Sequence, residues 1–389
     1  MSKESVRGKL SEIQLVRAIA IIGVLSVHAT SFATIAMKES NFYLAYNFFN
    51  IFMRIGTPVF LFLSSFVLFY SYYSRPLDKK LIGNFYKKRL QYILVPYVLF
   101  SVLYFFILHF MYYPDRSLEE TMEKFIVKLF TGKAYTHLYF IFISVQFYLM
   151  FPLFLWLFKR KPYFVKWAIP VGFVMQYAFM ILNKYYLFTD RPASWAFHYM
   201  SYFMLGAFLG IYYPKLKVWF QIQKEHVTAS RLTSWVVLWM IWLFASISHV
   251  YINHNARLNG VKYDSLLYHF LWNIQTITAG LVGIQIAHIL LRHAWPWLTR
   301  FMTRLGELSF GIYLIHPLFL LIYRKYPPET GFSPFIHLWY LGGFLFAFVA
   351  SWIVVSLIVR WVPMSWIIFG KVAPAKRKTR VVSEGGVSR

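Results

Sequence analysis

Two ionisable residues, Arg17 and His28, interrupt an otherwise apolar segment near the start of the chain. Ten residues separate them, so eleven helical steps of about 100° each turn the chain by roughly 1100°, which is three turns and about 20°. In a helix both side chains therefore lie on one face, about 16 Å apart along the axis. A guanidinium attracts anions and a neutral imidazole accepts protons. This face joins an anion-binding group to a proton acceptor.

Further ionisable residues lie in apolar segments, where they are costly and are therefore candidates for function. His137 lies near the start of one segment, and His316 precedes Pro317 in another. That proline removes a backbone donor and can bend a helix around a cavity. By the topology given below, His28, His137 and His316 lie at similar depth.

Two sets of cations complete the candidates. Arg54 is followed by Gly56 and Pro58, which should break the helix locally, and an outer pocket with Arg54 could hold an anionic group or a developing oxyanion. A basic run before the third apolar segment could bind a phosphorylated donor or could only anchor a helix beside anionic lipid. Its cations are Lys87, Lys88 and Arg89.

Each candidate also has a structural interpretation. Arg17 can be a cation that extends to the membrane surface, and His28 can be a hydrogen-bonded residue of a bundle interior. Three histidines at one depth could also ligate a metal, although no HExxH-type spacing or nearby carboxylate supports this, and we expect no metal. Four other histidines are interpreted as interfacial or bundle residues: His109, His198, His249 and His269.

The composition indicates that a membrane positions these residues. Of 389 residues, 59% are hydrophobic and only 14% are charged, although the net charge is +26. A basic soluble protein that binds nucleic acid would carry far more charged residues, and the apolar fraction exceeds the usual share of about half. The absence of cysteine excludes disulfides, thiolate catalysis and cysteine-type zinc sites. Any chemistry must come from His, Ser, Thr, Arg or carboxylates.

Ten segments are long and apolar enough to cross about 30 Å of hydrocarbon. Lys and Arg gather in alternate connecting segments, so the positive-inside rule predicts cytoplasmic N- and C-termini. The first segment lacks a small-residue cleavage site and is not expected to be a signal peptide. The predicted spans are 13–35, 46–73, 90–113, 136–158, 167–187, 195–213, 232–252, 263–291, 306–323 and 335–359.

These spans predict an all-α multi-pass protein of the cell membrane, a bundle of about ten transmembrane helices. Residues 1–359 form the transmembrane domain, and residues 360–389 form a basic cytoplasmic tail that is predicted to be disordered.

The motifs, taken in order along the chain, resemble those of the membrane-bound acyltransferase 3 family. The first helix of that family carries Arg, ten residues and then His, which Arg17 and His28 match. Each later motif is weak alone, but their shared order in a ten-span protein is specific. The later matches are 57–68, the basic loop 85–90, 137–140, 203–208 and 313–317.

The resemblance implies transfer of an acyl group, commonly acetyl, from cytoplasmic acyl-CoA to a hydroxyl of an extracytoplasmic glycan or lipid-linked sugar. Acyl-CoA is then a substrate, no cofactor is tightly bound, and nucleic acid is not a partner. We hypothesise that His28 acts as general base and that Arg17, with the basic run, positions the donor. His137 and His316 would orient the acceptor or stabilise the tetrahedral intermediate. A transporter or flippase for a sugar-linked or polyanionic lipid is the alternative.

The chain departs from the family pattern at two positions. The second helix reads Ser64-Ser65-Phe66 where the family usually has Ser-Gly-Phe. Tyr92 stands where a second Arg often follows the first by three residues. The first departure changes a position of close helix approach, and the second removes a paired arginine from the expected donor contact. We expect no fused extracytoplasmic hydrolase-like domain of the kind that some members of the family carry.

Overall fold

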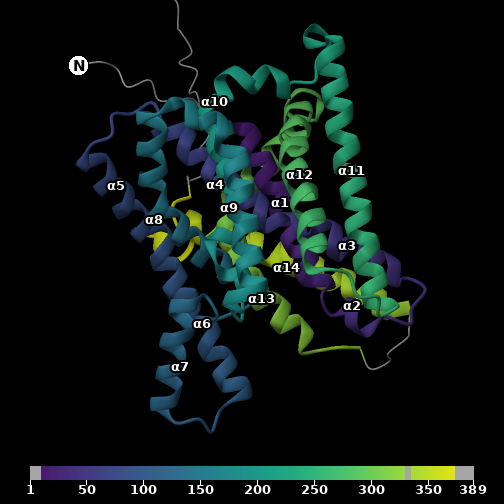
Figure 1. Cartoon of the computed structure of the whole chain (residues 1–389). Coiled ribbons are helices and arrows are strands. Elements are labelled where there is room, and N and C mark those ends of the chain that lie inside the picture. The colour runs from purple at the N-terminus through teal and green to yellow at the C-terminus, as the bar shows by residue number, and fades with distance from the viewer. Residues whose placement is uncertain (1–9, 329–333, 373–389) are drawn as a thin grey trace, which may run out of the picture.

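The structure is a computed structural model that describes residues 10–328 and 334–372. Within these residues every regular element is a helix, and the long helices form an upright bundle (Figure 1). The α-helices are α1 (Ser11–Thr30), α2 (Ala33–Ala36), α3 (Tyr43–Phe52), α4 (Gly56–Tyr72), α5 (Lys79–Arg89), α6 (Val95–Tyr112), α7 (Leu118–Thr131), α8 (Tyr139–Arg160), α9 (Ala168–Leu182), α10 (Met200–Phe220), α11 (Ala229–Leu258), α12 (Ser265–His293), α13 (Pro296–Arg324), α14 (Pro334–Trp361) and α15 (Trp366–Phe369).

Short 3₁₀ and π turns join or interrupt these helices. The first of them, at Met53–Ile55, separates α3 from α4 beside Gly56, where the sequence predicts a break. The turns are η1 (Met53–Ile55), η2 (Leu90–Leu94), η3 (Pro162–Trp167), η4 (Asn183–Leu187), η5 (Pro192–Ser194), η6 (Ala196–Tyr199) and η7 (Lys224–His226).

Nine helical segments within the described residues are long and apolar enough to cross a membrane. They coincide with nine of the ten predicted spans, so the all-α membrane bundle is confirmed. The remaining prediction, 195–213, corresponds to α10. The tyrosines of α10, together with Pro214 and Lys215, lower its mean hydropathy. Most of α10 is buried, and it packs chiefly against α4. A helix enclosed by other helices needs little lipid-facing apolar surface, which explains this composition.

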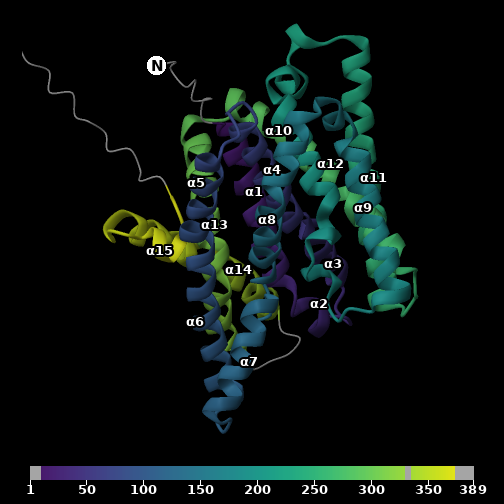
Figure 2. The ribbon, with the colours of Figure 1, turned by 60° about the vertical axis from the view of Figure 1, so that its left-hand side comes forward.

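α5 and α7 lie toward opposite ends of the bundle, and α6 connects these ends (Figures 1 and 2). Below we call them the α5 end and the α7 end. This alternation is what consecutive membrane crossings produce. Which end faces the cytoplasm stays a prediction from the Lys and Arg distribution.

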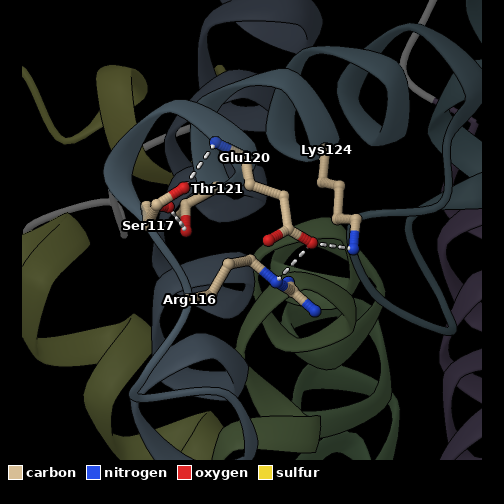
Figure 3. Close-up of polar contacts among 5 residues, drawn as sticks. All are labelled: Arg116, Ser117, Glu120, Thr121 and Lys124. Atoms are coloured by element: carbon tan, nitrogen blue, oxygen red, sulfur yellow. Dashed lines mark hydrogen bonds and ion pairs between the residues drawn. The ribbon is translucent and has the colours of Figure 1, made fainter.

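A helix forms where the sequence analysis placed only a connecting segment between the third and fourth spans. Ser117 caps α7 by accepting a hydrogen bond from the Glu120 backbone N–H at 3.3 Å, and the Ser117–Glu120 spacing is that of a capping box. The Glu120 carboxylate pairs with Lys124 and lies 3.4 Å from Arg116 (Figure 3). At the other end Gly132 takes the left-handed conformation that terminates helices. Local signals therefore suffice to form α7.

The close approach of α4 to α10 shows how the fold accommodates Ser65, which stands where the family pattern has glycine. Ser65 is buried in α4 and donates a hydrogen bond to the Phe203 carbonyl at 2.6 Å. The small residue at this crossing is Gly206 of α10, where an added Cβ would lie 2.7 Å from the Ser65 Cβ. The glycine therefore comes from α10 rather than from α4.

The first residues after α14 are ordered. α15 lies within the predicted tail 360–389, and its Phe369 is buried. This part of the tail is ordered because Phe369 packs between α6 and α13. The remainder, 373–389, lies outside the described residues, and its predicted disorder stays a prediction.

Candidate active site

Helix α1 links two separate cavities. Arg17 lines a cavity of about 350 Å³, here called the Arg17 cavity. His28 lines another of about 530 Å³, here called the His28 cavity. α1 is one uninterrupted helix through both positions and lies in the middle of the bundle (Figures 1 and 2). The two residues share a helix face but not a compartment.

The Arg17 cavity concentrates positive charge. Arg17, Lys88 and Arg89 of the predicted donor set line it, whereas Lys87 is exposed and does not. Helical rotation explains the difference, because neighbouring residues of α5 point about 100° apart. The Arg89 guanidinium lies 4.9 Å from the Tyr148 ring centroid, and its buried Nε has no hydrogen-bond partner among the described residues. Such a set attracts a polyanion.

One carboxylate, Glu307, also lines the Arg17 cavity. Arg304 donates a hydrogen bond to it at 3.1 Å, one helical turn away in α13. Glu307 is therefore paired within α13.

The His28 cavity contains Arg54 and no Asp or Glu among the described residues that line it. The sequence predicts a pocket at Arg54, and in the structure Arg54 lines a cavity together with His28. No ion pair or side-chain hydrogen bond of the Arg54 guanidinium occurs within the described residues, and Arg54 lines the cavity. An anion or a polarised oxygen in the cavity would therefore meet an uncompensated cation.

Three histidines that we interpreted as bundle residues also line the His28 cavity: His198, His249 and His269. The His198 and His269 rings lie 4.9 Å apart, and His249 Nδ1 lies 2.7 Å from the Gln275 side-chain oxygen. They come from η6, α11 and α12, three elements distant in sequence. Because no spacing relates them, sequence reasoning had no signal that would bring them together. Aromatic rings share the lining: Tyr139, Tyr199, Tyr268 and Trp272.

The three histidines predicted to lie at similar depth lie close together in the structure. The His28 and His316 ring centroids lie 5.1 Å apart, and those of His316 and His137 lie 5.7 Å apart. His137 and His316 are almost fully buried and do not line the two cavities. They stand behind His28 rather than facing a ligand.

Pro317 fixes the orientation of His316. A proline has no N–H, so the carbonyl of Tyr313, four residues earlier, lacks its helical donor. His316 Nδ1 lies 2.8 Å from that oxygen and 3.1 Å from the Ile312 carbonyl. Carbonyl oxygens only accept, so Nδ1 carries the proton and Nε2 carries the lone pair in a neutral ring. That Nε2 is buried and has no partner among the described residues.

Leu314, the residue after Tyr313 in α13, orients His137. The Leu314 carbonyl accepts a hydrogen bond from Tyr104 at 2.8 Å, and His137 Nε2 lies 3.2 Å from it. The Tyr104 hydroxyl in turn accepts from the Leu318 N–H at 3.2 Å. The Nε2 of His137 is then the protonated nitrogen, and its buried Nδ1 is unpaired in the described structure. Both histidines behind His28 are thus proton acceptors.

Polar contacts hold the part of α1 that carries His28. Arg324 of α13 donates to the His28 carbonyl at 2.5 Å, and its guanidinium also lines a third cavity of about 570 Å³ that His28 shares. On another side Asn50 donates to the Val27 carbonyl at 3.1 Å. Arg257 donates to the Asn50 side-chain oxygen at 3.0 Å. These bonds fix the position of the His28 backbone.

An aromatic layer separates the two main cavities. Phe60, Phe140 and Tyr313 line the Arg17 cavity, while Thr57 and Tyr139, nearby on the same helices, line the His28 cavity. The Phe140 ring lies 6.1 Å from that of Phe60 and 5.2 Å from that of Tyr313. On α4 and α8 the linings of the two cavities therefore lie within one helical turn of each other.

A metal centre finds no support in this geometry. Across the part of the chain that the structure describes, no group of three His, Asp or Glu side chains is placed to hold a metal ion. The nitrogens that would have to converge are partly occupied by the Tyr313 and Leu314 carbonyls. What the arrangement can do is accept a proton at His28 between a cationic cavity and a second, histidine-rich one.

Comparisons with known proteins agree with this geometry. A sequence model of a family described as an acyltransferase domain matches residues 10–358. The chain is 22% identical over 330 residues to a Bacillus subtilis (strain 168) protein whose name describes a membrane-bound acyltransferase, covering 81% of this chain and 82% of that protein. It is 26% identical over 290 residues, 68% of this chain and 69% of the relative, to a Staphylococcus aureus (strain MRSA252) protein whose name describes export of poly-β-1,6-N-acetyl-D-glucosamine. No solved structure matches.

Proposed function

Because the chain belongs to the acyltransferase 3 family of membrane-bound acyltransferases, we propose that it moves an acyl group from cytoplasmic acyl-CoA to a hydroxyl of an extracytoplasmic glycan or lipid-linked sugar. The observation that carries this proposal is that α1 presents Arg17 to one cavity and His28 to another. A donor and an acceptor can then approach the same helix from opposite sides of the membrane. Acetyl is the expected acyl group.

The Arg17 cavity would receive the donor. It lies at the α5 end, which the charge distribution assigns to the cytoplasm. Its cations Arg17, Lys88 and Arg89 would bind the phosphates of acyl-CoA, with the paired N–H groups of the arginines suited to phosphate oxygens. The flexible pantetheine arm would extend from there past the aromatic layer toward His28. Lys87, which faces away, is left out of this donor set.

The His28 cavity would receive the acceptor. Its mixture of aromatic rings and polar groups suits a sugar, and its volume is in the usual range for small-molecule sites. In the proposed step His28 removes the hydroxyl proton as the oxygen attacks the thioester carbonyl. The tetrahedral intermediate collapses, the C–S bond breaks, and the thiolate takes the proton back from His28. Arg54 would stabilise the oxyanion or hold an anionic group of the acceptor.

His137 and His316 take a different role in this proposal from the one expected from sequence. They are buried behind His28, so they would position its ring and would not contact the acceptor. The fixed tautomer of His316 leaves a lone pair on its buried, unpartnered Nε2, and in the proposal that lone pair would accept an N–H of His28, whose ring centroid lies 5.1 Å away. A histidine oriented in this way presents its other nitrogen as the base.

The test compares His28→Ala with His293→Ala in the purified protein reconstituted in vesicles with acetyl-CoA. His293 is exposed at the end of α12 and lines none of the described cavities, so its variant is the matched control. Removal of a general base should lower the rate of acyl transfer by about 10²–10⁴-fold. Mass spectrometry of surface polysaccharide and lipid-linked glycans, with and without the protein, identifies the acceptor. Wild-type transfer by His28→Ala overturns the assignment of the base.

Export of a sugar polymer is the second candidate, favoured by the name of the Staphylococcus relative. Export would require the aromatic layer to open further than acyl transfer does. A polymer would have to pass Phe60, Phe140 and Tyr313 as a whole chain, whereas in acyl transfer only the extended pantetheine arm of acyl-CoA has to pass. An exporter would move unmodified glycan without acyl-CoA. Loss of surface glycan with no change in the mass of what remains would favour export.

A further inference from the structure

The chain beyond the family match returns to the Arg17 cavity. The match ends at residue 358, whereas α15 and the two residues after Gly370 lie beyond it. Phe369, Lys371 and Val372 all line the Arg17 cavity. Figure 2 shows α15, in yellow, beside α6 and α13. One wall of the cavity is thus built from a segment that lies outside the family match.

Aromatic packing fixes α15 in this wall. Phe369 is 1% exposed, and its ring lies 6.1 Å from that of Phe100 in α6. Gly311 of α13 leaves room for it, since a Cβ there would lie 3.1 Å from the Phe369 ring. The Trp366 ring meets Tyr92 at 5.7 Å. This turn is therefore seated in the bundle.

Gly370 then turns the chain into the cavity. Its φ of +67° lies in the left-handed region that side chains rarely adopt, and a Cβ would lie 2.5 Å from the Tyr92 carbonyl oxygen. Both the backbone conformation of Gly370 and the lack of room for a Cβ there disfavour any residue other than glycine. The turn places Lys371 at the cavity, with its ammonium 5.9 Å from the Tyr92 ring centroid.

Lys371 adds a cation where the basic loop lacks one. Tyr92 occupies the position where the resemblance expects a second arginine, and Lys371 lies over its ring. The four cations of the cavity then come from α1, α5 and this segment. Arg89 lines the same cavity, and its Nε is buried and has no partner among the described residues. A phosphorylated donor held here would meet positive charge on several sides.

We propose that Trp366–Val372 completes the donor site and that Lys371 binds a phosphate of the acyl donor. This rests on the proposed function, because it takes the Arg17 cavity as the donor site. The contribution of Lys371 is electrostatic and exposed, so it weakens as salt rises. Gly370 acts through Lys371 by holding the turn.

The experiment measures binding of coenzyme A to the full-length protein in lipid nanodiscs by isothermal titration, without turnover. Lys371→Ala should raise the Kd about three- to tenfold at low salt, and Lys371→Arg should restore most of the affinity. Gly370→Ala should raise the Kd to a similar extent. Lys80→Ala is the matched control, since Lys80 is an exposed lysine of α5 that lines none of the described cavities, and it should bind as the wild type does.

The outcomes separate the two proposals. Wild-type Kd values for both Lys371→Ala and Gly370→Ala, with tight coenzyme A binding retained, would overturn the role of this segment and leave the proposed function standing. An equal loss in Lys371→Ala and Lys80→Ala would also overturn it, because the effect would then be general surface charge. No coenzyme A binding by the wild type would overturn the donor assignment itself. Thermal unfolding of each variant shows whether the fold is kept.

Discussion

Replacing Gly306 by alanine should separate the two helices that carry the candidate site. Gly306 lies in α13 against the backbone of α1 and lines the Arg17 cavity. An added Cβ would lie 2.6 Å from the Gln14 carbonyl carbon, whereas carbon atoms pack best at about 3.5–4.0 Å. The Gln14 carbonyl oxygen lies closer still, so the helices must part by at least about 1 Å at this level. Gln14 is less than one turn from Arg17, so the displacement reaches the donor site.

A misplacement of about 1 Å can lower catalysis about 10²-fold. Overpacking of this kind should also cost about 1–3 kcal/mol of stability. We therefore expect Gly306→Ala to lower kcat/KM for the acyl donor about 10²-fold while the protein still inserts and folds. The assay is acyl transfer by nanodisc-reconstituted protein, with thermal unfolding measured on the same samples.

Two other glycines make the reasoning refutable. A Cβ at Gly283 in α12 would lie 3.3 Å from the Val16 side chain of α1, and at Gly83 in α5 nothing lies within 4 Å. Activity should therefore fall in the order Gly83→Ala, Gly283→Ala, Gly306→Ala, with the first close to wild type. Equal activity in all three variants, or the largest loss at Gly283, would show that the α1–α13 spacing does not control the site.

Three further predictions concern single contacts. Pro317→Ala restores an N–H that competes with His316 for the Tyr313 carbonyl, so kcat should fall about five- to tenfold at unchanged thermal stability, and an unchanged kcat would contradict the orienting role. Arg17→Ala should raise KM for acyl-CoA at least about tenfold and weaken its salt dependence, whereas a pure kcat effect would argue against phosphate binding. The hydrogen bond from Lys124 lowers the pKa of Glu120 from 4.5, so its contribution to α7 is complete at neutral pH and is lost as pH falls through the lowered pKa. Hydrogen exchange of α7 should show that acid dependence in the wild type and not in Glu120→Gln.

Much of the fold follows from the sequence because membrane spans obey simple physical limits. A span must be long and apolar, and nine of the predicted spans match helices that meet both conditions. The family and the transferase class also follow, since the order of motifs holds over most of the chain. α7 was missed although Ser117, Glu120 and Gly132 mark its ends, because a search for apolar runs passes over short amphipathic helices.

The site was less predictable because cavities depend on tertiary packing. Helical periodicity put Arg17 and His28 on one face, but it could not show that a layer of aromatic rings divides that face between two cavities. Lys87 and Lys88 are neighbours in sequence, and only the packing of α5 decides which one faces the donor cavity. His198, His249 and His269 come from separate elements, and Lys371 follows the last predicted span. No sequence spacing relates the three histidines to one another or Lys371 to the basic run.

Contacts with α13 fix the position of α1 at several levels along its length. Gly306 admits the α1 backbone near Gln14, the His316 ring beside Pro317 lies against the His28 ring, and Arg324 at the end of α13 donates to the His28 carbonyl. None of the three needs to touch a substrate to act. Because α1 itself supplies both Arg17 and His28, a shift of α13 at any level would change donor binding and proton transfer together. Substitutions in α13 should therefore alter KM and kcat jointly, whereas substitutions that contact only one ligand should change one of them.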